Sequence, residues 1–509
     1  MDPNHRLFDV LPPARRVWAI PDLALASVTS KDRMAVYASS DSLYRGAIFG
    51  RDSLEVAEDL LTVKPKLVHN ILLTLGRLQG TKENGANEEE PGKIIHEYRN
   101  TNIDGEQIRG KQLEIFEQLS AKWGGNNQEL AYYGSIDATP QFLRTLGMYC
   151  LQHGDAILDE TVLQRNGETK TMREVAHAAV SWLTGKLAVS KSGLVEYRRI
   201  NPRGISNQVW KDSEEFYVHE NGQLANHDSP IASIEVQGLA YDGLLAAATF
   251  FPAKATFYTQ AAEKLRDRTL ELLWQEDRRY FALGIDFDND DKLRVIETKT
   301  ANPASLLDTA FFDGLQPGES ERYISAIIRT MMSPDFLTNA GIRSRALSAG
   351  HLFKEWDYHG SFVTWPKETY GIAKGFRRQG FPLLARQLEN RLLNLVIKNH
   401  EYPEFVYVDD WGQVLGGAPV IRKHGNARSV PGINKPERIQ AWTVSAIMAI
   451  VNRRLKEKFS RTRKGSAQTW QTEYEKYILQ RIPLVDRYLN PLTLRGRYPT
   501  FKYRLDNKG

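Results

Sequence analysis

Apolar residues recur with helical spacing along most of the chain. In PKLVHNILLTLGRLQG (65–80), the apolar side chains from Leu67 to Leu78 fall on one stripe, Pro65 occupies the first turn and Gly80 follows the last. The same spacing predicts further helices at about 53–63, 140–153, 171–187, 236–249, 255–276, 319–331, 367–379, 381–399 and 439–458. Because strand signals are few and do not alternate with the helices, the pattern favours an all-α array over a parallel α/β sheet.

One stretch has the alternation that is typical of strands. RYFALGIDFDNDDKLRVIET (279–298) contains two such runs around an acidic turn, which predicts a β-hairpin inserted between helices. Four acidic residues in it, Asp286, Asp288, Asp290 and Glu297, also match the ligand spacing of an EF-hand calcium loop. Asp291 stands where that loop needs glycine, and no amphipathic helices flank it, so we favour the plain hairpin and expect no metal site.

The composition is that of a soluble globular protein. The chain has 509 residues, of which 41% are hydrophobic and 25% are charged. A single cysteine, Cys150, excludes an internal disulfide and fits a reducing compartment. No apolar run has the length of a signal peptide or a membrane span. We therefore expect a cytoplasmic protein that does not enter the membrane.

The charge is distributed unevenly. The net charge is +5, yet residues 451–509 alone carry 15 Lys and Arg against 5 Asp and Glu. This basic tail raises the alternative of a nucleic-acid contact, but Lys and Arg spread over a terminal helix are more typical of a solvated face. We expect no nucleic-acid partner, and the sequence does not define an oligomeric state.

Polar and aromatic side chains concentrate in a few loops. In GAIFGRDSLEVAEDLL, Arg51 and Asp52 precede a helix whose expected N-cap is Ser53, so they are candidates either for gripping sugar hydroxyls or for a cap and a surface salt bridge. In YYGSIDATPQFL, Asp137 lies just outside the next helix, close to Tyr133. It is a candidate for a sugar-facing pocket or for stabilising the helix dipole.

Two further loops each hold a carboxylate among aromatic residues. Trp210 and Asp212 occur in NQVWKDSEEFYVHENG, and Glu404 occurs in YPEFVYVDD. Glycoside hydrolysis needs one carboxyl as proton donor and a second as base or nucleophile, and this pair meets that requirement. A chain with 62 acidic residues contains many such pairs, so spacing alone does not select this one.

The polar stretches in their order along the chain resemble a known family. They are FGRDSLEVAEDLL, GKIIHEYR, YYGSIDATPQFL, NQVWKDS, IEVQGLAYDGL, DYHGSFVTWPKETYGIAKGF, YPEF and IQAWTVSAI. Together they resemble the glucosidase domain of glycogen-debranching enzymes, the amylo-α-1,6-glucosidase family, and more distantly the neutral invertases. The resemblance runs from about residue 45 to residue 455.

The resemblance implies a fold and a division of the chain. The fold is an (α/α)6 toroid of six inner and six outer helices, here with a small inserted β-hairpin. Its active site lies at the end where the loops leading into the inner helices gather. We expect an N-terminal extension at 1–44, the catalytic barrel at 45–458 and a basic C-terminal tail at 459–509.

The resemblance also implies roles for the two carboxylates. Asp212 corresponds to the proton donor and Glu404 to the base that deprotonates water, which gives inversion and requires carboxyls roughly 6.5–9.5 Å apart. Glu437, in KPERIQAW, is a rival base, although Pro436 and Glu437 also fit a first helical turn.

Ten further residues are expected to bind substrate. They are Arg51, Asp52, Tyr133, Asp137, Trp210, Lys211, Glu235, Gln237, His359 and Trp365. The helical stripe AWTVSAIMAIV favours a core position for Trp442.

The expected activity is that of an inverting, exo-acting α-glucosidase. Its substrates would be α-1,6 or other α-glucosidic linkages of short or branched glucans, cleaved without a cofactor or metal. The alternatives are a hydrolase of another small glycoside, such as sucrose, trehalose or a rhamnoside, and a non-catalytic carbohydrate-binding barrel.

Overall fold

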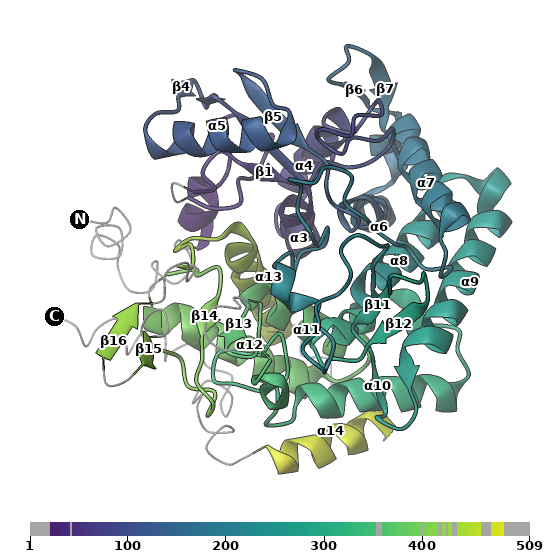
Figure 1. Cartoon of the computed structure of the whole chain (residues 1–509), viewed down its shortest axis with the longest axis vertical. Helices are drawn as coiled ribbons and strands as arrows, with labels where there is room; N and C mark the ends of the chain where they lie inside the picture. The colour runs from purple at the N-terminus through teal and green to yellow at the C-terminus, as the bar shows by residue number, and fades with distance from the viewer. Residues whose placement is uncertain are drawn as a thin grey trace.

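The computed structural model describes residues 21–40, 43–352, 359–399, 401–415, 420–423, 426–429, 435–459 and 470–482. Among these residues, six inner elements close into a ring. In ring order the inner elements are α3 (Gly50–Leu60), α6 (Ala138–His153), α8 (Ile234–Phe250), η4 (Asn302–Asp308), α11 (Pro366–Arg378) and α13 (Ala441–Phe459). Figure 1 labels five of them, α3, α6, α8, α11 and α13. Each packs against the next, and α13 packs against α3. The expected all-α toroid is therefore confirmed.

Each inner element is followed along the chain by an outer helix. The outer helices are α4 (Pro65–Arg77), α7 (Met172–Val189), α9 (Ala255–Leu273), α10 (Pro317–Met331), α12 (Pro382–Asn399) and α14 (Trp470–Arg481). The outer helix α4 is amphipathic and buries Val68, Ile71, Leu72 and Leu75, as the stripe in the sequence predicts. The inner helix α8 is apolar on most sides because it has neighbours on most sides.

Small residues bring two inner helices close together. A Cβ atom on Gly243 of α8 would lie 2.9 Å from the carbonyl oxygen of Pro140 on α6, and one on Gly147 of α6 would lie 2.7 Å from the Cβ of Ala246 on α8. Substituting either glycine would therefore push the two helices apart.

Ion pairs join the inner elements around Arg144 of α6. Its guanidinium contacts the carboxylates of Glu58 on α3, Asp242 on α8 and Asp308 on η4, at 2.5, 3.1 and 3.0 Å. A second set joins three elements: Lys374 of α11 pairs with Asp59 of α3, and the hydroxyl of Ser445 on α13 donates to the same carboxylate. Because charges out of water are costly unless paired, this network favours a single register of all six elements.

The fourth inner element is a 3-10 helix that the helical pattern does not predict. Its sequence, NPASLLD, has Pro303 in the first turn, and a second short 3-10 helix, η5 (Ala310–Phe312), follows before the turn at Gly314. Proline and glycine leave too few residues between them for the apolar spacing of an α-helix to show.

Short strands lie outside the ring. The predicted hairpin is confirmed: β11 (Gly284–Phe287) pairs antiparallel with β12 (Leu293–Ile296), and β11 also pairs with β8 (Ala232–Ser233). β1 (Ile48–Phe49), β2 (Glu97–Asn100) and β5 (Glu129–Tyr132) form a second small sheet beside α5 (Lys111–Trp123). The remaining pairs are β3 (Asn102–Ile103) with β4 (Glu106–Gln107), β6 (Thr161–Leu163) with β7 (Thr169–Thr171), β9 (Trp274–Gln275) with β10 (Tyr280–Phe281), β13 (Val363–Thr364) with β14 (Val406–Tyr407), and β15 (Val420–Lys423) with β16 (Asn426–Ser429).

The basic C-terminal segment contains a helix that docks on the barrel. The carboxylate of Glu475 on α14 accepts the backbone N–H groups of Leu383 and Leu384 at 2.7 and 2.9 Å, at the start of α12. Trp470 and Tyr474 pack edge-on against Phe381. Residues 460–469 and 483–509, which carry much of the tail's positive charge, lie outside the described residues.

Candidate functional site

A cavity of about 60 Å³ lies at the end of the ring where α3, α11 and α13 begin. Its walls come from segments that are far apart in the sequence. They are Ala38, Tyr44, Phe49, Arg51, Asp52, Trp210, Asp212, His359, Trp365, Glu404, Gln440 and Trp442. Seven of the twelve residues predicted for catalysis or substrate binding meet here.

Asp212 and Glu404 line the same cavity, and the charge of Asp212 acts on Glu404. Burial is the main cause that raises the pKa of Glu404 to about 8; the carboxylates of Glu437, Asp52 and Asp212 also raise it, and a hydrogen bond from the Glu437 backbone N–H opposes them. Near neutral pH Glu404 therefore keeps its proton in the substrate-free protein. Two neighbouring carboxyls can act as acid and base when the proton lies on one of them and the other is ionised.

Aromatic rings form one wall of the cavity. Trp365 stacks on His359 with ring centres 4.9 Å apart and an angle of 16° between the planes, and it meets Trp210 edge-on at 5.6 Å. Phe405, next to Glu404, packs on the same Trp365 ring at 4.8 Å. Flat apolar faces of this kind suit the apolar face of a pyranose ring.

Trp442 is buried in a small aromatic cluster with Trp365 and Phe405, as the helical stripe predicts, and it also lines the cavity. It is the second residue of α13, so its side chain lies at the end of the ring and not between helices. Its indole Nε1 and the side-chain oxygen of Gln440 are buried without a hydrogen-bond partner among the described residues. Buried polar atoms normally have partners, so these two mark positions where a ligand's hydroxyl groups would bond.

The charge pair in the first stretch lies inside the helix and not before it. α3 begins at Gly50 after Phe49, so Arg51 and Asp52 occupy its first turn and the expected N-cap, Ser53, is buried within the helix. Burial raises the pKa of Asp52 to about 6, against the lowering effects of Arg51 and Lys367. Both side chains line the cavity.

Asp137 lies behind the cavity and does not line it. Its two carboxylate oxygens accept hydrogen bonds from Arg51 at 3.2 and 3.0 Å, and Ser135 donates to the first of them at 2.6 Å. Asp137 is 2% exposed, and these contacts satisfy both of its carboxylate oxygens. We therefore assign Asp137 the role of holding Arg51, in place of direct sugar binding.

Glu235 and Lys211 support Trp210 from beneath the cavity wall. The indole Nε1 of Trp210 donates to Glu235 at 2.8 Å, and the ammonium groups of Lys211 and Lys367 lie 4.7 and 4.9 Å from the centre of the same ring. Lys211 is fully buried and pairs with Glu368. These contacts fix the orientation of Trp210, whereas Glu235 and Lys211 themselves do not line the cavity.

Tyr133 and Gln237 are held by backbone groups away from the cavity. The hydroxyl of Tyr133 donates to the Leu78 carbonyl at 2.9 Å, beyond the end of α4. The amide of Gln237 exchanges hydrogen bonds with the backbone of Val195 at 2.8 and 3.1 Å. Neither side chain lines the cavity, and both bond the backbone of the barrel.

His359 is a neutral part of the aromatic wall. Burial, together with the positive charges of Lys211, Arg51 and Arg345, holds its pKa well below the usual range. Its Nδ1 lies 3.0 Å from the hydroxyl of Ser213, next to Asp212. An uncharged imidazole at this position can orient the Asp212 loop without adding charge to the cavity.

Sequence reasoning missed the N-terminal contribution to the site. Ala38 and Tyr44, within the expected extension at 1–44, line the cavity with Phe49. Burial and the charges of Glu404 and Asp212 raise the pKa of Tyr44. Tyr44 and Phe49 lie within six residues before Gly50, Arg51 and Asp52, and this proximity in the sequence is the one signal that could have identified them.

The rival base, Glu437, is adjacent to the cavity but does not line it. Its carboxylate accepts a hydrogen bond from Ser39 at 2.5 Å. Its backbone N–H donates to the carboxylate of Glu404 at 3.1 Å. The position of the two residues favours Glu404 as the group that faces a substrate.

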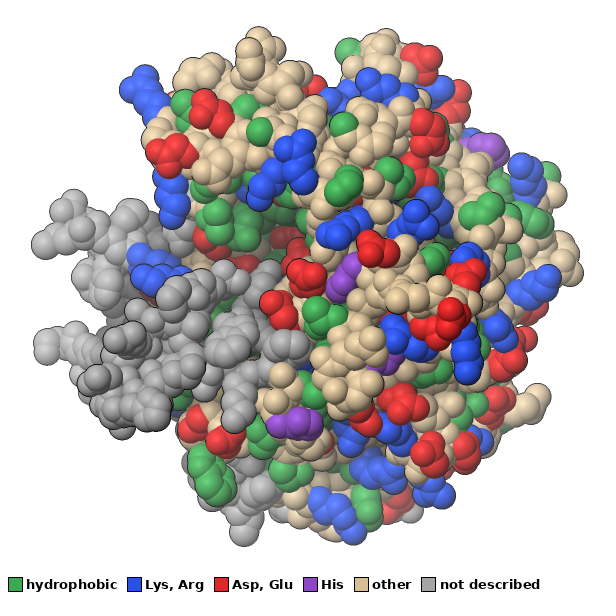
Figure 2. Space-filling model, in the orientation of Figure 1, with side chains coloured by type: hydrophobic (Ala, Val, Ile, Leu, Met, Phe, Trp, Pro, Cys, Tyr) green, Lys and Arg blue, Asp and Glu red, His purple; other side chains and the backbone are tan. Residues whose placement is uncertain are grey.

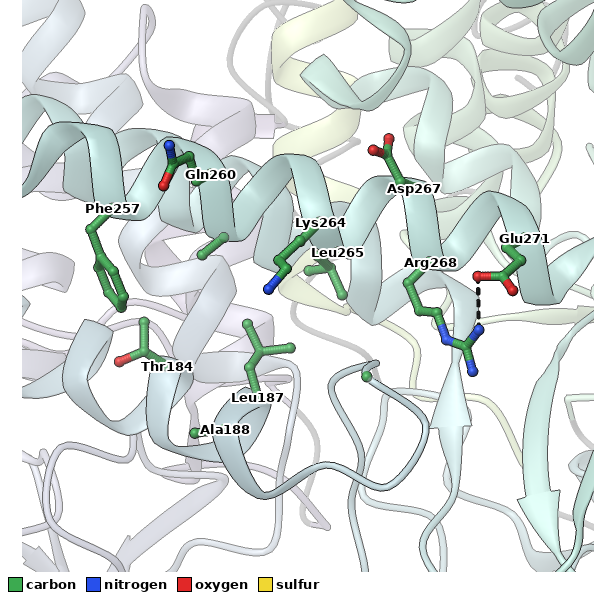
Figure 3. A pocket seen from close by; sticks show the side chains of 12 residues that line it. Thr184, Leu187, Ala188, Phe257, Gln260, Lys264, Leu265, Asp267, Arg268 and Glu271 are labelled. Carbon is green, nitrogen blue, oxygen red and sulfur yellow. Dashed lines mark hydrogen bonds and ion pairs between the residues drawn. The ribbon is translucent and has the colours of Figure 1, made fainter.

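A larger cavity of about 650 Å³ lies between the outer helices α7 and α9 (Figure 3). Leu187 and Leu265 form its apolar floor, and Lys264 and the Arg268–Glu271 ion pair stand along α9. Its lining contains none of the residues of the aromatic cavity, so size alone does not indicate the chemistry.

The acidic hairpin uses its carboxylates for ion pairs. Asp286 is buried and accepts hydrogen bonds from Arg294 and from the backbone N–H of Asn226, and it lies 3.3 Å from His219. In the part of the chain that the structure describes, no three His, Cys, Asp or Glu side chains gather in a way that would hold a metal ion. None of the described helices combines the length and the apolar character needed to cross a bilayer.

Charges of both signs are interspersed on the surface. On the face shown in Figure 2, the Lys and Arg side chains of the described residues alternate with Asp and Glu.

Comparisons with known proteins identify the fold. No model of a known protein family matches the chain, and no curated protein matches its sequence. A mannosylglycerate hydrolase of glycoside hydrolase family 63 from Thermus thermophilus, in complex with glucose, is similar in structure, with a TM-score of 0.55 and 12% identity over 87% of this chain and 100% of that chain.

Two further solved structures are similar over the same region. An uncharacterised conserved protein from Thermus thermophilus has a TM-score of 0.53 at 12% identity, over 87% of this chain and 100% of that one. A glycosidase variant in complex with glucose has a TM-score of 0.51 at 12% identity, over 86% of this chain and 96% of that one. The chain thus has the all-α toroid fold of these structures, two of which are glycosidases.

Proposed function

We propose that the protein is an inverting glycoside hydrolase in which Asp212 donates a proton and Glu404 is the base. One observation carries this proposal. Two carboxyls from distant loops, those of Asp212 and Glu404, line the same small, aromatic-walled cavity. Because Glu404 lines the cavity and Glu437 does not, we prefer Glu404 as the base.

The proposed reaction needs two proton transfers. Asp212 protonates the oxygen of the leaving group as the glycosidic C–O bond breaks, and Glu404 removes a proton from the water that attacks the anomeric carbon from the opposite face. The products are the free alcohol and a sugar of inverted configuration. In the reactive state the proton of the pair lies on Asp212 and Glu404 is ionised. After turnover Glu404 carries the proton and Asp212 is ionised, and a proton returns to Asp212 through solvent before the next cycle; the chemistry requires no cofactor.

The aromatic wall and the charge pair serve orientation. A terminal sugar ring would stack against Trp365 or Trp210, while Arg51, Asp52, Gln440 and the indole N–H of Trp442 would bond its hydroxyls. Because the aromatic rings exclude water from the cavity, each of these polar contacts is stronger than it would be in water.

For the substrate we propose a terminal α-glucoside, in an α-1,6 or other α-linkage of a short or branched glucan. The resemblance to amylo-α-1,6-glucosidases supports this assignment and the exo-action. Glucose is bound in two structures of similar fold.

The second candidate is the hydrolysis of another small glycoside. It is favoured by the fact that one similar structure is a mannosylglycerate hydrolase. The third candidate is a carbohydrate-binding barrel without catalytic activity, and the presence of both carboxyls in one cavity argues against it.

A substrate panel tests the proposal. The purified protein is incubated with isomaltose, branched dextrins, sucrose, trehalose and mannosylglycerate, and the first-formed anomer is followed by proton NMR. We expect β-glucose to appear first from an α-glucoside. Retained configuration would contradict the mechanism, and turnover of mannosylglycerate alone would select the second candidate.

A further inference from the structure

Residues 38–40 pair with the segment that carries Glu437. The backbone N–H of Ser40 donates to the Ile439 carbonyl at 3.2 Å, and that of Ala441 donates to the Ala38 carbonyl at 2.9 Å. The expected extension at 1–44 thus includes residues that are integrated into the wall of the candidate active site.

The segment with Glu437 is paired on its other side with the segment that carries Glu404. The backbone N–H of Glu404 donates to the Glu437 carbonyl at 2.9 Å, and the N–H of Glu437 donates to the side chain of Glu404 at 3.1 Å. The backbone N–H of Gln440 also donates to the Tyr402 carbonyl at 2.8 Å. The position of the Glu404 carboxyl therefore depends on where the backbone of Glu437 lies.

One side-chain contact fixes Glu437 within this three-segment ribbon. Ser39 is fully buried, and its hydroxyl donates to the carboxylate of Glu437 at 2.5 Å. Glu437 is 7% exposed, so its carboxylate must be satisfied by protein groups. Loss of the serine hydroxyl would remove one hydrogen bond to this buried carboxylate and would let the backbone around it shift.

We propose that Ser39 and Glu437 form a clamp that positions Glu404, so that the N-terminal segment sets the geometry of the base. This inference rests on the proposed function, in which Glu404 must stand within hydrogen-bond reach of the attacking water. Neither clamp residue lines the cavity, so both act through Glu404 as positioning residues. A displacement of about 1 Å at a reacting group is enough to lower a rate about 100-fold.

The first test separates catalysis from binding. We expect Ser39→Ala to lower kcat at least about tenfold and to leave KM within about twofold, because the sugar contacts of the cavity remain. Ser39→Cys keeps the size of the side chain but donates a weaker hydrogen bond, so its kcat should lie between those of the wild type and Ser39→Ala. The matched control is Ser30→Ala, because Ser30 is a buried serine of the same segment that bonds Asp32 at 2.6 Å, and it should leave kcat unchanged. An unchanged kcat in both Ser39 variants would overturn the proposal.

The second test uses the charge of Glu437. The carboxylates of Glu437, Asp52 and Asp212 each raise the pKa of Glu404. Arg51 and Tyr44 line the same cavity and also face this carboxyl. Glu437→Gln keeps an oxygen that accepts from Ser39 but removes the negative charge. We expect it to move the alkaline limb of the kcat/KM profile to lower pH with kcat at the optimum preserved within about tenfold. A profile identical to the wild type would show that Glu437 does not act on Glu404.

A readout without substrate separates failure of the clamp from failure of the proposed function. In protein labelled with ¹³C at glutamate carboxyls, the signal of Glu404 is assigned by its loss in Glu404→Gln. We expect its titration to change in Ser39→Ala and Glu437→Gln and to stay the same in Ser30→Ala. If no glycoside is hydrolysed but the titration of Glu404 changes in the two clamp variants, the clamp is supported and the proposed function is refuted. If glycosides are hydrolysed and the titration is unchanged in both clamp variants, the clamp is refuted.

Discussion

Arg51, in the first turn of α3, donates to both carboxylate oxygens of Asp137, the residue before α6, at 3.2 and 3.0 Å. Both side chains are less than a tenth exposed. The pair joins two neighbouring inner helices and presents Arg51 to the cavity. It also explains why the sequence places an Asp beside a tyrosine pair in a loop: the carboxylate anchors a cation that lines the site.

Removing Asp137 tests this relationship. Asp137→Ala leaves the buried guanidinium of Arg51 without its partner, and such losses cost about 3–5 kcal/mol. We expect a loss of this order in the free energy of unfolding, measured with urea, together with a higher KM. The control is Asp159→Ala, which removes a surface pair with Arg173 and should change the stability by less than about 1 kcal/mol. Equal stability of the two variants would contradict the assigned role.

Substitution of either proposed catalytic carboxyl should abolish most of the activity. Asp212→Asn and Glu404→Gln each remove one proton carrier, and we expect kcat to fall by about 10²–10⁴-fold with thermal unfolding still cooperative. Asp290→Asn, in the exposed turn of the hairpin, is the matched acid-to-amide control. If Glu404→Gln stays active while Glu437→Gln does not, the base is Glu437.

The pH profile follows from the pKa of Glu404. The reaction needs one proton on the pair of carboxyls, because one must donate while the other accepts. The pKa of Glu404 is raised to about 8, so the pair loses its last proton as the pH rises through about 8. We therefore expect kcat/KM to fall above about pH 8. A rate that still increased at pH 9.5 would be incompatible with this pair.

Glu235 should make the protein less stable at alkaline pH. Burial raises its pKa to about 7 in the folded state, against 4.5 as the ordinary value. A raised carboxyl pKa means that the folded state binds the proton more tightly, so this stabilisation is complete below the ordinary value and is lost as the pH rises through about 7. In Glu235→Gln the fall in unfolding free energy between pH 5 and pH 8 should be smaller by the order of a few kcal/mol. Parallel curves for wild type and variant, from urea titrations across this range, would rule the effect out.

The helical array was predictable because it depends on local spacing, whereas the toroid was implied by the family resemblance. The apolar stripe of residues 65–80 and the Pro65 start occur within one helix length, and the structure confirms the helix. The predicted hairpin at 279–298 is confirmed for the same reason. The fourth inner element escaped prediction because Pro303 and Gly314 shorten it below the length at which periodicity is visible.

The candidate site was predictable in part. Arg51, Trp210, Asp212 and Glu404 stand in polar and aromatic loops that a packed core does not require, and they do meet in one cavity. Their chemical roles stay predictions. Gln237 has the same kind of sequence context as Glu235, yet it bonds the backbone of Val195, because neighbouring positions on a helix face different directions.

By itself, the sequence determined most of the helices, that they form an all-α array, and which loops concentrate polar and aromatic side chains. Only the tertiary structure decided which of those side chains share a cavity and which support it from behind. It placed Tyr44 and Ser39 of the N-terminal segment beside Glu404 and Glu437. The physical reason is that helix formation depends on residues within a few turns, whereas the direction of a loop side chain depends on backbone pairing with segments hundreds of residues away.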